Sequence, residues 1–377
     1  MELQAASQIT EFDRTLAIFD EGQVVATAGI FSFEMTVPGG AVVPTGGVTR
    51  VSVRSTHRRR GLLTAMMGRQ LEDIHARGEP LAALFASEAP IYGRYGYGIG
   101  TYDLEVEIER ARAGFAQPSE DSGRISLVER EAAAQLLNRV WEKVRPRQPG
   151  MLSHTKAWWR YLLTDLETWR RGQSEQFRAV FEIDGEPEGY ALYRLKLDWK
   201  YNLPDGTLTL DSLVASSPRA YAALWRHCLG VDLMARVRAE MRPVDEPLRL
   251  LLRDARGVRT SLYDALWIRL VDARAALAAR RYATSGTLVL ELKDALCPWN
   301  QGRFRIESTI EGATCAPTTA RADLALDISD LAAGYMGANR FQTLLQAGRI
   351  DELTPRAASR ADALFSSDRV AWCPTHF

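Results

Sequence analysis

The sequence predicts an α/β protein of three domains, of which the first two share one order of strands and helices. The chain has 377 residues, more than one hydrophobic core usually holds, so roughly two to three domains are expected. A strand, a basic turn, a helix and a buried strand follow one another over residues 48–86, and a similar order returns over residues 124–229. Strands at residues 287–293 and 302–308, followed by a helix at residues 329–336, predict a smaller α/β domain at the end of the chain.

The first domain opens with the pattern of a β-hairpin. Apolar runs at residues 16–19 and 24–33 flank a turn at residues 20–22. Residues 48–53 predict another strand, in which Val51 and Val53 alternate onto one face. The chain therefore enters the basic turn from a strand.

A turn of three arginines and a glycine, residues 58–61, connects that strand to a helix. Apolar side chains at helical spacing predict the helix, and Gly78 is typical of a residue that ends one. Residues 81–86 are an unbroken apolar run, as expected of a strand that is buried on both faces. The spaced apolar residues of the helix are Leu63, Met67, Leu71 and Ile74, with Leu62 and Met66 beside them.

This order of elements favours an anion site at the start of the helix. A right-handed crossover places the helix N-terminus at the end of the strand, where unpaired amides and the helix dipole attract negative charge. A pyrophosphate fits such a site, because Gly61 lets the backbone approach it and the arginines add charge. The alternative is a solvated basic face. The turn is not a P-loop, which ends in Gly-Lys-Ser/Thr, and it lacks the three glycines of the dinucleotide fingerprint.

The composition argues against several functional classes. Lysine plus arginine equals aspartate plus glutamate, at 47 each, so we expect neither a nucleic acid nor an anionic membrane as partner. No apolar run approaches the roughly 18 residues of a membrane-spanning helix, and the first residues lack the pattern of a secretory signal. The four cysteines and five histidines are scattered, which predicts a reduced, cytoplasmic protein without a metal site.

Four segments together resemble the Eis (enhanced intracellular survival) branch of the GNAT N-acetyltransferases. They are Val51-Ser52-Val53, residues 56–63 (THRRRGLL), Ala86-Ser87-Glu88 and residues 91–98 (IYGRYGYG), at the spacing of the family. The resemblance continues to the final residue of the chain. It implies tandem GNAT folds followed by a sterol-carrier-like domain, with domains at residues 1–115, 124–282 and 283–377. It also implies a homo-oligomer, a hexamer in the family.

The resemblance implies acetyl-CoA as co-substrate and an amine as acceptor, which could be an aminoglycoside, a protein lysine or another amine. In GNAT enzymes the strand before the turn pairs with the pantetheine arm, and the turn holds the pyrophosphate. Leu63 departs from the general GNAT motif, which has Gly or Ala there. The implied cofactor-binding residues are Val51, Ser52, Val53, Arg59, Arg60, Gly61, Leu62, Leu63, Thr64, Ser87 and Glu88.

Acetyl transfer to an amine needs a proton acceptor for the ammonium and a proton donor for the leaving thiolate. Tyrosine, with a pKa near 10, suits the donor, and the resemblance selects Tyr92 over Tyr95 and Tyr97. All three could instead be half-buried tyrosines at the rim. No cysteine lies near these motifs, which favours direct attack without an acyl-enzyme.

The proton acceptor implied by the resemblance is the C-terminal α-carboxylate, here on Phe377. A free α-carboxylate has a pKa near 3.5, so burial or a water relay has to assist it. His376 is a rival base by residue type, since its ordinary pKa is near 6.5. An ordinary chain terminus would be frayed and solvated.

Two departures from the family pattern affect the prediction. The second domain has Ser216-Ser217-Pro218 where the basic glycine turn should stand, so we expect no cofactor there. The hairpin begins by Leu16, which leaves no room for the strand and two helices that usually open a GNAT domain and predicts an apparently truncated start. The alternative function is therefore a non-catalytic protein that binds acyl-CoA or lipid.

Overall fold

The computed structural model describes residues 2–118 and 123–377, and the chain divides into two compact units. We call the one with residues 10–102, 146–153 and 264–377 the site unit. The other, which we call the central unit, holds the described residues of 1–9, 103–145 and 154–263.

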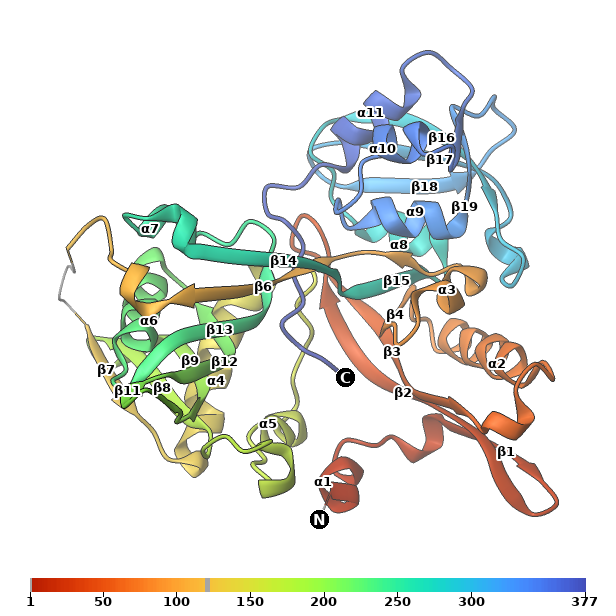
Figure 1. Ribbon diagram of the computed structural model, residues 1–377. Helices are drawn as coiled ribbons and strands as arrows, with labels where there is room; N and C mark the ends of the chain where they lie inside the picture. The colour runs from red at the N-terminus through yellow and green to blue at the C-terminus, as the bar shows by residue number, and fades with distance from the viewer. Residues whose placement is uncertain (1, 119–122) are drawn as a thin grey trace. The chain divides into compact units, whose positions relative to one another are not determined.

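A six-stranded sheet in the order β1-β2-β3-β4-β15-β5 forms one half of the site unit (Figure 1). Strands β1 to β3 form an antiparallel meander, which confirms the predicted hairpin. β4 lies parallel to β3, and the predicted helix, α2 (Leu62–Ala76), connects the two. The strands are β1 (Thr15–Asp20), β2 (Gln23–Thr36), β3 (Val42–Val53), β4 (Leu81–Phe85), β5 (Gly98–Ile99) and β15 (Leu266–Leu270).

The two faces of this sheet have different neighbours. α2 covers one face, where Met67 and Ile74 share an apolar cluster with Ile30 of β2. Because side chains alternate along a strand, Phe31 and Phe33 point to the opposite face. That face receives the end of the chain, which Figure 1 shows beside β2 and β3. One face is thus closed by a helix and the other by the C-terminal tail.

Two strands join a different sheet from the strand that precedes them in sequence. β15 follows the central unit in sequence, yet it pairs with β4 and β5 and completes the six-stranded sheet. β6 (Tyr102–Glu109) pairs instead with β13 (Met234–Pro243) in the sheet of the central unit. The domain limits expected from the sequence, 1–115, 124–282 and 283–377, therefore remain predictions, because both sheets draw on segments from either side of them.

A five-stranded sheet in the order β18-β17-β16-β19-β20 forms the other half of the site unit. β16, β17 and α9 confirm the two strands and the helix predicted at the end of the chain. Arg269 of β15 is fully buried and forms an ion pair of 2.7 Å with Asp294, which ties this half to the six-stranded sheet. The elements are α8 (Ala273–Ala279), β16 (Gly286–Lys293), β17 (Gly302–Ser308), β18 (Ala313–Pro317), β19 (Leu324–Asp327), α9 (Ile328–Tyr335), α10 (Phe341–Gln346), β20 (Ile350–Glu352) and α11 (Ala357–Phe365).

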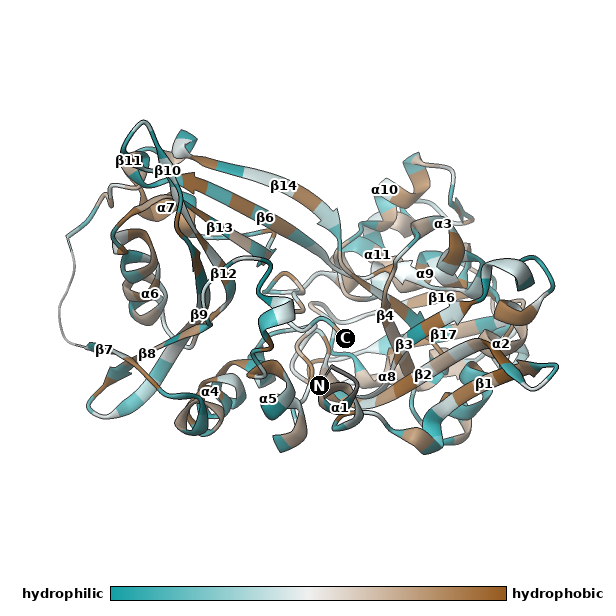
Figure 2. Cartoon of the chain, turned by 60° about the horizontal axis from the view of Figure 1, so that its bottom comes forward, coloured by the Kyte–Doolittle hydropathy of each residue, from teal (hydrophilic) through white to brown (hydrophobic). Residues whose placement is uncertain are grey.

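The central unit is built on a seven-stranded sheet in the order β14-β6-β13-β12-β9-β8-β7. Alternating brown and teal bands along β6 in Figure 2 show why it forms a strand with one buried face. The sequence predicts a hairpin from residues 177–183 and 189–197 around Asp184-Gly185, and helices at residues 129–144 and 219–229. The structure confirms the hairpin and both helices. The remaining elements are β7 (Arg124–Leu127), α4 (Arg130–Val144), α5 (Lys156–Leu162), β8 (Phe177–Ile183), β9 (Glu186–Lys196), β10 (Trp199–Lys200), β11 (Leu203–Pro204), β12 (Gly206–Ala215), α6 (Pro218–Gly230), α7 (Leu248–Leu251) and β14 (Val258–Asp264).

Two stretches differ from the elements that the sequence predicts, and part of a third lies outside the described residues. Apolar residues at helical spacing predict a helix over residues 153–166. Only the shorter α5 forms, because the backbone N of Ser153 donates to Glu34 O at 2.8 Å instead of entering a helix. α1 (Glu2–Ser7) and a 3-10 turn (Phe12–Arg14) occupy the stretch before β1. The polar, turn-rich residues 115–123 predict a linker, of which residues 119–122 lie outside the described part of the chain.

Candidate active site

The parallel strands β3 and β4 pair over only three residues and then separate. Their ladder joins residues 45–47 to residues 81–83. β3 continues to Val53 and β4 to Phe85, so in this fully described stretch the facing edges carry backbone groups that no strand pairs. Such an opening suits an extended ligand with amides of its own, because the ligand can complete the unpaired ladder.

A β-bulge in β3 shapes this free edge. Arg50 and Val51 together oppose a single residue of β2, Ala28, and Arg50 has a φ of +52°. A bulge shifts the alternation of side chains by one position. As a result Val51 and Val53 pack with the first turn of α2, while Ser52 stays exposed.

The N-terminus of α2 follows this strand and is open. Its N-cap is Gly61, with a φ of +80°, and a Cβ atom there would meet nothing within 4 Å. Glycine also supplies no side chain to bond the first-turn amides. The amides of Leu62, Leu63 and Thr64 therefore lie at a helix end that can receive an anion.

The three arginines before Gly61 are all exposed. Arg60 lies 3.8 Å from Asp20, whose carboxylate is also 2.9 Å from Nε2 of His57. Arg58 and Arg59 have no ion pair among the described residues, so their charge is free to meet a ligand. The turn thus combines open amides with at least two uncompensated guanidinium groups.

Tyr92 ends the short helix α3 (Ala89–Tyr92), directly after the exposed Ser87 and Glu88. Its side chain is only 6% exposed. Burial raises the pKa of Tyr92 above its ordinary value, a hydrogen bond with the Ser87 hydroxyl opposes this, and the carboxylate of Glu88 adds to it. The phenol is therefore protonated at neutral pH, as a proton donor has to be.

The two neighbouring tyrosines have different surroundings. The Tyr95 hydroxyl lies 3.2 Å from Oγ1 of Thr64, and so links this segment to the first turn of α2. The ring of Tyr97 stands edge-on to that of Tyr92 at 6.2 Å, and its hydroxyl is buried without a hydrogen-bond partner among the described residues. Tyr92 is the member of the three whose hydroxyl bonds the strand-end residue Ser87.

The last residue of the chain packs onto the sheet at the point where β3 and β4 separate. The ring of Phe377 lies 5.1 Å from that of Phe33 and 5.4 Å from that of Phe85, centroid to centroid. A Cβ atom on Gly47, the last residue of β3 that pairs with β4, would come within 2.5 Å of the Phe33 ring and 3.1 Å of the Phe377 ring. The absence of a side chain at Gly47 therefore makes the seat for the terminal ring.

His376 lies beside this seat. Its ring tilts over Phe85, with a centroid distance of 4.6 Å. This contact removes water from the imidazole and lowers its pKa, although the residue as a whole stays exposed. His376 is thus neutral at pH 7 and remains a rival proton acceptor.

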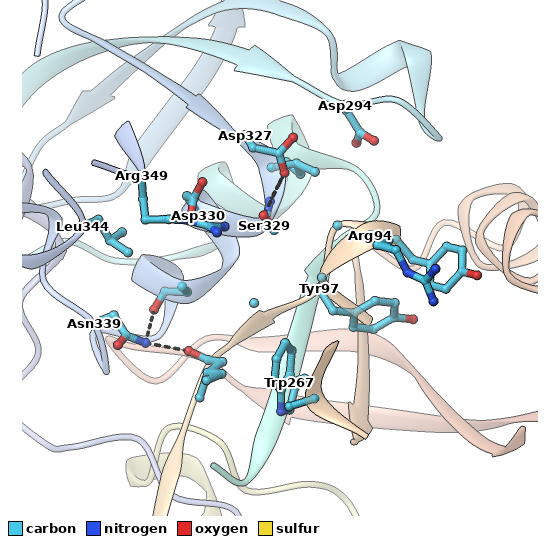
Figure 3. A pocket seen from close by; sticks show the side chains of 18 of the residues that line it. Arg94, Tyr97, Trp267, Asp294, Asp327, Ser329, Asp330, Asn339, Leu344 and Arg349 are labelled. Atoms are coloured by element: carbon cyan, nitrogen blue, oxygen red, sulfur yellow. Dashed lines mark hydrogen bonds and ion pairs between the residues drawn. The ribbon is translucent and has the colours of Figure 1, made fainter. Parts of the chain in front are cut away.

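A separate hollow of about 670 Å³ lies between the segment after α3 and the start of α9 (Figure 3). Tyr97 and Trp267 line one side of it, and Asp327 and Asp330 the other. Asp330 pairs with Arg349 at 2.8 Å. This charged lining differs from the continuous apolar wall that a lipid tunnel would need.

Among residues 2–118 and 123–377, no three His, Cys, Asp or Glu side chains gather as they would around a metal ion. Within the same residues, no helix is long and apolar enough to cross a membrane.

Comparison with known proteins agrees with the order of folds. Residues 2–100 and residues 150–274 each match an acetyltransferase (GNAT) domain, and residues 273–374 match a sterol carrier protein domain. An uncharacterized N-acetyltransferase of Streptomyces avermitilis is 44% identical over 98% of this chain and 90% of its own length. The N-acetyltransferase Eis of Mycobacterium tuberculosis is 36% identical over 92% of this chain and 84% of its own.

The chain belongs to the Eis family of N-acetyltransferases. The crystal structure of Eis1 from Mycobacterium abscessus superposes with a TM-score of 0.85 at 35% identity, covering 99% of this chain and 92% of that one. The chain is thus an N-acetyltransferase with tandem GNAT folds and a sterol-carrier-like domain, as its motifs indicated. The structure gives the positions of the expected site residues, while their functional roles stay predictions.

Several residues around the site of this Eis family member were not foreseen from the sequence. Gly47 seats Phe377, and Arg50 forms the bulge in β3. The pair Gly46-Gly47 inside an apolar strand was a usable signal, because glycine within a strand often marks a close approach of other atoms. No comparable local signal announces the bulge at Arg50.

Proposed function

We propose that this protein transfers the acetyl group of acetyl-CoA to a primary amine by direct attack. The open edge of β3 at residues 51–53 would pair with the pantetheine arm. The turn from Arg59 to Thr64 would hold the pyrophosphate, with Ser87 and Glu88 at the end of the neighbouring strand. The free ladder edge, the open helix N-terminus and the space at Gly61 support this assignment.

The observation that carries the proposal is the position of Phe377. Its ring rests on Gly47, where the ladder between β3 and β4 ends, and this supports a place for the terminal carboxylate at the opening between the two strands. An ordinary terminus would be solvated and mobile. A terminus seated between three rings of the sheet has instead a defined place beside the proposed thioester position.

In the proposed reaction the carboxylate of Phe377 accepts a proton from the substrate ammonium, directly or through a water molecule. The amine nitrogen then bonds the acetyl carbon as the carbon–sulfur bond breaks. Tyr92 gives its proton to the departing sulfur, because burial keeps the phenol protonated. The attacking nitrogen loses its second proton to the phenolate of Tyr92, and the carboxyl group of Phe377 releases its proton to water. The products are an amide and a thiol, and no covalent enzyme intermediate is formed.

The GNAT fold of the central unit is proposed to bind no CoA. Ser217 caps α6 with its own hydroxyl, which accepts a hydrogen bond from Ala220 N at 3.3 Å. The carboxylate of Glu188 bonds Ser216 next to it, which places negative charge where a phosphate would have to bind. The equivalent end of α2 has no side-chain cap, and the carboxylate of Asp20 near it lies 3.8 Å from the positively charged Arg60.

Arg59→Ala is expected to weaken acetyl-CoA binding by about 1 to 3 kcal/mol, the range for a hydrogen bond to a charged group. Isothermal titration measures this, and the same titration of the unaltered protein should give one acetyl-CoA per chain. Arg69→Ala is the matched control, because Arg69 is an exposed arginine of α2 whose partner is Glu72, at 3.4 Å. An unchanged affinity after Arg59→Ala would remove Arg59 from the site.

We also propose a cytoplasmic homo-oligomer, a hexamer as the family resemblance implies. The four cysteines are buried and form no disulfide among the described residues, which fits a reducing compartment. The β10–β11 hairpin exposes a group of large apolar side chains that association would cover. Sedimentation velocity should therefore find a species several times the 42.0 kDa of one chain, and a monomer at micromolar concentration would contradict this. The exposed side chains are Leu197, Trp199, Tyr201 and Leu203.

A further inference from the structure

The tail that ends at Phe377 has no regular secondary structure after α11, yet much of it is buried. Trp372 is 6% exposed, and Cys373 and Thr375 are nearly inaccessible. A segment without a ladder of its own needs specific partners to keep one register, because its backbone groups are not paired internally. The residues that supply these partners come from a distant part of the chain.

A short segment, residues 148–153, supplies them, and we call it the clamp. It belongs to the site unit, although the sequence on both sides of residues 146–153 belongs to the central unit. On one side the clamp pairs with the end of β2, where Gly150 N donates to Thr36 O at 2.8 Å and Thr36 N donates to Met151 O at 3.0 Å. The clamp is therefore fixed to the same strand that carries Phe31 and Phe33.

On its other side the clamp bonds the tail. Trp372 N donates to Pro149 O at 2.8 Å, and Nε2 of Gln148 donates to Val370 O at 2.8 Å. Gly150 makes this approach possible. It has a φ of +94°, and a Cβ atom there would lie 2.7 Å from the carbonyl oxygen of Trp372 and 3.0 Å from its nitrogen.

We infer that the clamp sets the register of the tail and so positions the terminal carboxylate, with Gly150 as its positioning residue. The tail is held to β2 at two points, through the clamp at Trp372 and directly at Phe33. A shift at the first point moves Phe377 along its seat on Gly47. The inference rests on the proposed role of that carboxylate.

Gly150→Ala tests the inference, because its Cβ would meet backbone atoms, which cannot move as a flexible side chain does. We expect kcat to fall about a hundredfold, the effect of an ångström of misplacement, with an unchanged KM for acetyl-CoA. Carboxypeptidase A should also release Phe377 faster from the folded variant. Gly172→Ala is the matched control, since Gly172 has a φ of +79° and open space around its Cβ position.

A second variant avoids backbone strain in case Gly150→Ala folds poorly. Gln148→Ala removes one hydrogen bond to the tail, and should give the same pattern with a smaller loss of kcat. If both variants match Gly172→Ala in kcat and in release of Phe377, the clamp does not hold the tail. Faster release of Phe377 with normal kcat would confirm the clamp and show that the proposed base is wrong, so the two failures are distinguishable.

Discussion

Deletion of Phe377 is expected to reduce kcat by at least about a hundredfold while acetyl-CoA binds normally. The shortened chain ends in a carboxylate on His376, displaced by up to roughly 3.5 Å along the backbone. It also loses the ring that rests on Phe33, Phe85 and Gly47, so nothing seats the new terminus. Misplacement of a catalytic group by an ångström can cost about a hundredfold in rate. Steady-state kinetics and calorimetric titration of the same preparation measure the two quantities.

A C-terminal amide tests whether the charge of the terminal carboxylate is needed as well as the position of the Phe377 ring. Ligation of a synthetic peptide can give a chain that ends in Phe377 amide, which keeps the ring in its seat but removes the carboxylate. If the carboxylate is the base, the amide should be as inactive as the deletion. The same ligation with the natural acid is the control for the procedure.

His376→Ala distinguishes the rival base. This variant keeps the terminal carboxylate and loses only the imidazole that tilts over Phe85. It should retain most of the activity. Loss of turnover in His376→Ala, combined with a fully active Phe377 amide, would transfer the role of base to the imidazole.

The sequence predicted the strand, turn and helix around Gly61 well because these elements are local. A glycine before an apolar helical run and a strand before that glycine lie within about one supersecondary unit, where spacing alone determines which groups meet. Gly61 does cap α2, and Val51 and Val53 do share a face. The bulge at Arg50 turns that shared face toward α2, which the alternation itself did not reveal.

The parts that could not be predicted depend on contacts between distant segments. The apolar run that forms β15 predicts a strand. Its composition does not indicate that this strand pairs with β4, which lies far away in sequence, before the central unit. The burial of Arg269 has the same origin, because its partner Asp294 lies on a later segment. Tertiary pairing, rather than propensity, decided both.

The packing place of the Phe377 ring also depends on contacts between distant segments and could not be predicted from the sequence. Three rings from β2 and β4 and one glycine from β3 meet the last residue of the chain. Only the family resemblance indicated a role for the C-terminus. Residue patterns alone predict a solvated terminus. The segment 148–153 that holds the tail was expected to begin a helix at its end, so its role in the site unit emerged only from the structure.

Tyr92→Phe is expected to lower kcat by about a hundredfold to ten-thousandfold, the usual contribution of a general acid. The ring, its contact with Tyr97 and the binding of acetyl-CoA should remain, because only the hydroxyl is lost. In the unaltered enzyme the acid works while it is protonated, so activity falls as the pH rises through its pKa. Burial raises that pKa above its ordinary value, so kcat should decline only at a higher pH than an unperturbed tyrosine would allow.

Tyr97→Phe is the matched control for this prediction. The Tyr97 hydroxyl is fully buried and has no hydrogen-bond partner among the described residues, so its removal leaves no other group unpaired. This variant should keep both kcat and the alkaline limit of the pH profile.

A leaving thiol of lower pKa needs less help from an acid, so acetyl transfer from an activated aryl thioester should be impaired less by Tyr92→Phe than transfer from acetyl-CoA. Equal losses with the two donors, or a loss confined to Tyr97→Phe, would show that Tyr92 does not protonate the leaving sulfur.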